Sequence, residues 1–149
     1  MKKTSPKSKR SITCCAVLTL IISALSAAVQ DPVIPDFAKD LPDVVLAESI
    51  KEGNKETIRL RTGLSAKEFT AKIRSFMKKA GWRNRKLTKS DMTMAAQKGR
   101  MMNVEVRLYA YENAELPGTF IQVFYLLPKV EKKRASIEIV VNRPSPAER

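Results

Sequence analysis

The side chains that usually carry out catalysis are scarce in this chain. There is no histidine, and the only two cysteines, Cys14 and Cys15, lie in the first 28 residues. Their absence downstream excludes Ser-His-Asp triads, thiol nucleophiles and zinc sites with histidine or cysteine ligands. With five glycines, the chain also lacks a glycine-rich phosphate loop. We therefore expect no catalytic residues, no cofactor, no metal and no enzyme activity. The alternative is a carboxylate-dependent hydrolase, in which acids such as Glu105, Glu112 and Glu115 would have to pair.

Basic side chains, in contrast, are concentrated in one part of the chain. Lysine and arginine total 28 against 15 acids, and residues 67–100 carry eleven bases and only two acids. Such a cluster attracts phosphate-rich or carboxylate-rich partners over a long range. We expect it to bind an anionic lipid or wall polymer, and the alternative is that these cations only keep the protein soluble. The candidate binding residues are Lys78, Lys79, Arg83, Arg85, Lys86 and Lys89.

A second candidate surface is an aromatic face of a predicted sheet. If two strands align, their outward side chains form an apolar patch, and uncovered apolar patches commonly mark interfaces. We expect this face to bind a second copy or an envelope protein. The alternative is that the chain's own Val33, Ile34 and Phe37 cover it. The candidate interface residues are Arg107, Tyr109, Tyr111, Ile121, Val123 and Tyr125.

The first 28 residues have the pattern of a signal peptide. A basic head, with Lys2 at its start and Arg10 at its end, precedes an uncharged run over 11–29, and Ala28 follows other small residues. We expect cleavage near Ala28 and a periplasmic or secreted product without disulfides. An uncleaved N-terminal membrane anchor is the alternative, because the uncharged run is just long enough to span a bilayer. Export argues against nucleic acid as a partner.

The remainder divides into a Pro-rich linker over 29–42, a single domain over 43–142 and a disordered tail over 143–149. The most clearly predicted element is a helix over 66–80. Ser65 and Glu68 form a capping box before it, and apolar residues such as Phe69 and Ile73 recur at helical spacing within it. Gly81 is suited to end this helix, and Trp82 is expected to pack back onto it.

Strands are predicted on both sides of this helix. A hairpin over 44–50 and 57–61 precedes it, and strands over 92–96, 102–111, 120–127 and 136–142 follow, the first two joined by a tight turn at 98–100. In the strand over 102–111, aliphatic side chains such as Val104, Val106 and Leu108 are expected beneath the helix. The strand over 120–127 is apolar on both faces and should be central. The order predicts an α+β fold: an antiparallel sheet of five to seven strands with one amphipathic helix packed on one face.

One stretch resembles a known group of proteins. Residues 65–99, in which the capped helix ends in Ala80-Gly81-Trp82 and a Lys98-Gly99 turn follows, resemble small exported bacterial α+β domains of uncharacterised function. The resemblance implies the fold and carries no active-site motif. The function we expect is therefore that of an exported, non-enzymatic binding or interaction module of the cell envelope or the secreted fraction.

Overall fold

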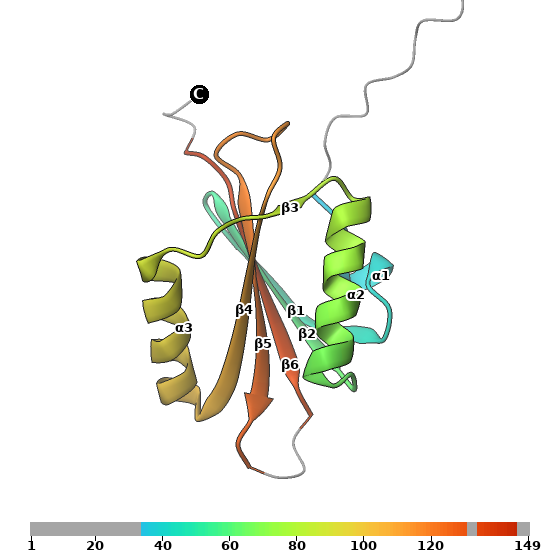
Figure 1. The fold of residues 1–149 in the computed structure, drawn as a ribbon, viewed down its shortest axis with the longest axis vertical. Helices are drawn as coiled ribbons and strands as arrows, with labels where there is room; N and C mark the ends of the chain where they lie inside the picture. The colour runs from blue at the N-terminus through green and yellow to red at the C-terminus, as the bar shows by residue number, and fades with distance from the viewer. Residues whose placement is uncertain (1–33, 131–133, 146–149) are drawn as a thin grey trace, which may run out of the picture. The chain divides into compact units, whose positions relative to one another are not determined.

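The described part of the protein has three layers, with helices on both sides of one sheet (Figure 1). The structure is a computed structural model and describes residues 34–130 and 134–145. Helices α1 and α2 lie on one side of the sheet, and α3 lies on the other. In chain order the elements are α1 (Phe37–Asp40), β1 (Val44–Glu52), β2 (Lys55–Thr62), α2 (Ala66–Lys79), β3 (Arg83–Asn84), α3 (Lys89–Met102), β4 (Val104–Glu112), β5 (Phe120–Pro128) and β6 (Ser136–Asn142).

The six strands pair in the order β1-β2-β6-β5-β4-β3, and every pairing is antiparallel. The predicted α+β class and the strand count are confirmed. Strand β5 is central, as its two apolar faces predicted. Strand β6, the last in the chain, lies between β2 and β5 and so joins the two hairpins into one sheet.

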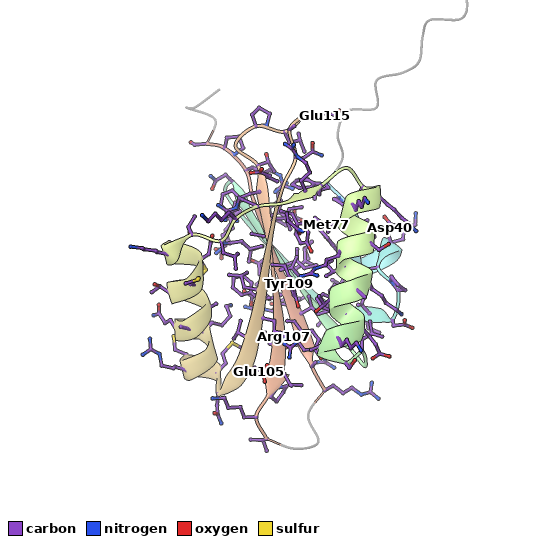
Figure 2. All side chains as sticks on the ribbon, in the orientation of Figure 1. Asp40, Met77, Glu105, Arg107, Tyr109 and Glu115 are labelled. Atoms are coloured by element: carbon purple, nitrogen blue, oxygen red, sulfur yellow. The ribbon has the colours of Figure 1, made fainter. Side chains whose placement is uncertain are left out.

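Helix α2 forms as its sequence predicted. The Ser65 hydroxyl accepts a hydrogen bond from the Glu68 backbone N–H at 3.3 Å, and the Glu68 carboxylate accepts one from the Ser65 N–H at 2.9 Å. Phe69, Ile73 and Met77 are fully buried on the face that meets the sheet, and Figure 2 places Met77 on that side of α2. Each buried side chain of this kind contributes roughly 1.5 to 3 kcal/mol, so the sheet stabilises a helix that would not persist alone.

Helix α3 occupies the region where we predicted a strand over 92–96 and a tight turn at 98–100, so both predictions are wrong. Thr88 and Asp91 form a second capping box, and Asn103 ends the helix in the left-handed conformation, with φ of 52°. Gly99 brings the helix against β4, because a Cβ at this position would lie 3.2 Å from the Val104 carbonyl oxygen. Met92, Met94 and Met102, which fall within the predicted strands, are exposed on this helix.

The presence of α3 reverses our assignment of the faces of β4. Val104, Val106 and Leu108 pack in a smaller cluster together with Ala95 of α3. The opposite face, which includes Tyr109 and Tyr111, packs in the main core with α2. Helices therefore cover both faces of a sheet for which we predicted a helix on only one face.

The boundaries of the domain also differ from the prediction. Phe37 and Leu41, expected in the linker over 29–42, are buried in the main core, where the Phe37 ring lies 5.7 Å from that of Phe76. At the other end, Arg143 belongs to the fold, because its side chain pairs with Glu56 at 2.7 Å. The predicted signal peptide over 1–28, residues 29–33 of the predicted linker and residues 146–149 of the predicted tail lie outside the described residues.

Candidate functional site

The predicted cationic residues lie on one connection, which we call the basic segment (residues 78–89). It runs from the end of α2 through β3 to the start of α3 and crosses one end of the sheet (Figure 1). It contains no acidic residue. Five of its six cations are exposed and form no ion pair with any described residue. These five are Lys78, Lys79, Arg83, Lys86 and Lys89.

Backbone contacts hold the first half of the basic segment in place. Gly81 has φ of 80°, a conformation that glycine adopts without strain, and it turns the chain out of α2. Trp82 is buried as predicted, and its backbone N–H donates to the Met77 carbonyl at 2.9 Å. Arg83 and Asn84 then pair with the end of β4 as β3. The cations around Trp82 are therefore attached to a fixed backbone.

The sixth cation, Arg85, has a structural role instead. Its guanidinium donates to both carboxylate oxygens of Asp91, at 3.0 and 3.2 Å, and lies 4.5 Å from the centre of the Phe120 ring. Asp91 is only 4% exposed and also accepts hydrogen bonds from the Gln122 side chain and the Thr88 N–H, both at 2.7 Å. Because its charge is neutralised inside the fold, Arg85 is a weaker candidate for ligand binding than the other five cations.

The surroundings of Asp91 keep it ionised. Burial alone would raise the pKa of its carboxyl group, because removal of water disfavours the charged form. Hydrogen bonds from Thr88 and Gln122, together with the charge of Arg85, outweigh burial and lower the pKa below its usual value. The resulting cluster of Thr88, Arg85, Asp91 and Gln122 joins the basic segment, α3 and the central strand β5.

A hollow of about 330 Å³ lies beside the basic segment. Arg83 and Arg85 line one part of it, and Leu116, Pro117 and the Phe120 ring line another. Glu112 also lines the hollow, so its charges are mixed. It can receive a small group that is both polar and apolar, but it does not define an anion site by its charge alone.

The predicted aromatic interface is not an exposed surface. Tyr111, Ile121, Val123 and Tyr125 are at most 1% exposed, because α2 packs over them. Burial raises the pKa of Tyr111 to about 12, so its hydroxyl stays protonated at neutral pH. Of the six predicted residues, only Tyr109 and Arg107 reach the surface, and Arg107 pairs with Glu105 at 3.4 Å. Sequence analysis placed this face outward because it overlooked α3.

The carboxylates considered for hydrolysis do not converge. Glu105 and Glu112 lie near the two ends of β4, and seven residues of strand span about 23 Å. Figure 2 shows Glu105 and Glu115 at opposite ends of the sheet. Within residues 34–130 and 134–145, no group of three or more acidic side chains is placed to hold a metal ion. None of the helices described here has the length and apolar character needed to cross a membrane.

Comparison of the chain with protein families, with curated proteins and with solved structures found no match. The site therefore has to be interpreted from its own geometry. Its main feature missed in the sequence is the Asp91 cluster. The signal that would have revealed it is Thr88 three residues before Asp91, which is the spacing of a helix-capping box.

Proposed function

We propose that this protein is an exported, non-enzymatic binding module that attaches to an anionic component of the cell envelope through the basic segment. The observation that carries the proposal is the group of five exposed cations on a backbone fixed by Trp82 and β3. Outside the basic segment, five cations of the described residues form ion pairs with carboxylates, as Lys72 does with Asp43 and Lys98 with Glu138. No carboxylate of the described residues neutralises the five exposed cations of the basic segment, so they are available to an external anion.

The expected strength follows from the number of cations that reach the surface. A lysine or arginine near an anionic membrane contributes about 1 kcal/mol. Five such residues would give several kcal/mol at low salt. Because these contacts are exposed and the Debye length is about 10 Å at 0.1 M salt, the affinity should fall steeply with ionic strength.

The test is sedimentation of the purified protein with vesicles that contain phosphatidylglycerol, compared with vesicles of phosphatidylcholine alone. We expect binding to the anionic vesicles only. The double variant Lys86→Glu/Lys89→Glu should weaken it at least tenfold. The matched control is Arg61→Glu/Lys67→Glu, which makes the same change in net charge at exposed positions outside the basic segment.

Equal losses of affinity for the anionic vesicles in the two double variants would show that net charge, and not the basic segment, determines binding. Binding that is absent, or that does not change between 50 and 500 mM salt, would also refute the proposal. A parallel experiment with purified anionic wall polymer identifies which envelope component is preferred. Export itself is tested by fractionation of the source cells, with the protein expected outside the cytoplasm.

A further inference from the structure

Strand β3 pairs with only part of β4, so the rest of this edge of the sheet is unpaired among the described residues. Strand β3 is two residues long and pairs only with Tyr111 and Glu112 of β4. Beyond it, the Arg85 N–H donates to the Ala110 carbonyl at 2.8 Å, and the chain then leaves for α3. From Leu108 to Val106, β4 is an edge strand without a neighbouring strand on that side among the described residues, whereas the Val104 carbonyl oxygen lies close to Gly99 of α3. Figure 1 shows β3 crossing only one end of β4.

The unpaired backbone groups can be assigned residue by residue. In an antiparallel sheet the N–H and C=O of one residue point to the same side, and the side alternates along the strand. Because the Ala110 carbonyl points outward to Arg85, the backbone groups of Leu108 and Val106 point outward as well. Those of Arg107 and Tyr109 point toward β5. The edge therefore offers donors and acceptors at alternate residues, as a strand does for an incoming partner.

A hollow of about 390 Å³ runs between this edge and α3. On the helix its walls are the small residues Ala95, Ala96 and Gly99, and on the strand they are Val104 and Val106. Small residues on the helix leave room for side chains of moderate size. Since side chains of an added strand alternate in direction, every second one would enter this hollow.

The charges around the hollow favour an acidic partner. Arg100 and Lys129 line it, are exposed and have no ion-pair partner in the described chain. Its one acid, Glu105, already contacts Arg107 at 3.4 Å. The net charge left for a ligand is positive.

The opposite edge of the sheet is less suited to strand addition. The pairing of β1 with β2 has an irregularity between Leu46 and Glu48. Such bulges twist an edge strand away from regular pairing and protect it from unwanted partners. No irregularity occurs in the pairing of β4 with β5.

We propose that the β4 edge binds an extended peptide of another protein, which adds a strand beside Val106–Leu108, inserts apolar side chains between α3 and β4, and places a carboxylate near Arg100 and Lys129. This surface is separate from the basic segment, and binding here does not depend on the anionic ligand proposed above.

The experiment is selection from a phage-displayed library of random decapeptides on the purified protein, followed by fluorescence polarisation with the enriched peptide. The blocking variant is Ala96→Phe, which fills the hollow from an exposed helix position. The matched control is Ala71→Phe, the same change at an exposed position of α2. We expect at least tenfold weaker binding to Ala96→Phe and unchanged binding to Ala71→Phe.

Amide hydrogen exchange provides the decisive signature. The bound peptide should slow exchange at the Val106 and Leu108 amides at least tenfold, whereas the Arg107 and Tyr109 amides are already hydrogen-bonded to β5 and should change little. Failure to enrich any peptide, or equal binding by the two variants, would overturn the proposal. Slow exchange at Val106 and Leu108 in the free protein would also overturn it, because a second copy or another part of the chain would then occupy the edge.

Discussion

Replacement of Asp91 by alanine tests whether the buried cluster stabilises the fold. The carboxylate is 4% exposed and accepts hydrogen bonds from Thr88, Arg85 and Gln122, all between 2.7 and 3.2 Å. Alanine at this position removes the charge that Arg85 pairs with, the acceptor for Gln122 and half of the capping box of α3. All three losses occur in the folded state, so Asp91→Ala should be strongly destabilising.

The magnitude follows from the burial of the two charged partners. Removal of one partner of a fully buried ion pair costs about 3 to 5 kcal/mol. The Arg85 side chain is 21% exposed, so water can solvate it in part and the cost lies near the lower end. We expect a loss of about 3 kcal/mol in the free energy of unfolding, which is a large share of the 5 to 15 kcal/mol typical of a domain. In a domain of this size the melting temperature should fall by on the order of 10 °C.

Urea unfolding followed by tryptophan fluorescence measures this loss, because Trp82 is the single tryptophan and is buried. The control is Glu105→Ala, which removes a carboxylate from an exposed pair with Arg107. Exposed pairs contribute less than about 1 kcal/mol. A loss below about 1 kcal/mol in Asp91→Ala, or a loss equal to that of the control, would refute the inference that this cluster joins α3 to the sheet.

Three further predictions use the same measurement. The pKa of Asp91 in the folded state lies below its unfolded value of 3.8, so its contribution to stability is complete above that pH and is lost as the pH falls through the folded pKa. Wild type should therefore lose more stability below about pH 4 than Asp91→Asn. Identical acid unfolding profiles of the two proteins would contradict this. Tyr111→Phe should leave stability unchanged or raise it by up to about 1 kcal/mol because that hydroxyl is buried without a partner, whereas Tyr125→Phe should lose about 1 kcal/mol with its hydrogen bond to the Leu64 carbonyl. A larger loss of stability in Tyr111→Phe than in Tyr125→Phe would contradict this expectation. Phe37→Ala should cost about 3 to 5 kcal/mol, since its ring is fully buried, and a loss below 1 kcal/mol would place α1 outside the core.

Elements whose own residues carry a clear local signal could be predicted from the sequence. Helix α2 has a capping box at Ser65, apolar residues at helical spacing and Gly81 at its end, and all three agree. Strand β5 was assigned to the centre because both of its faces are apolar. In each case the residues that determine the element lie within the element itself.

Helix α3 could not be predicted by the same reasoning, because its apolar residues do not form one stripe. Met92 and Met101 are exposed, and the face that meets the sheet carries Asp91, Ala95 and Gly99, which are acidic or small. The helix is held by contacts with β4 and by Asp91, and of these only the capping-box spacing of Thr88 and Asp91 shows in the local sequence.

The exposure of the basic segment could be predicted and the burial of the aromatic face could not, for a related reason. Exposed cations such as Lys86 follow from composition, and their exposure holds whichever element carries them. The position of Tyr111 depends on which of two apolar faces of β4 receives α2. The pairing of the whole sheet and the positions of both helices determine which face this is, so it could be established only from the structure.

The place of β6 in the sheet has a consequence for how the chain is made. Residues Ser136–Asn142 follow every other strand of the described sheet in the chain, yet they form the only link between the β1–β2 hairpin and the β4–β5 hairpin in that sheet. Two-stranded hairpins are marginally stable by themselves. The two hairpins can therefore join into one sheet only after Ser136–Asn142 has been synthesised, and loss of this segment would divide the sheet.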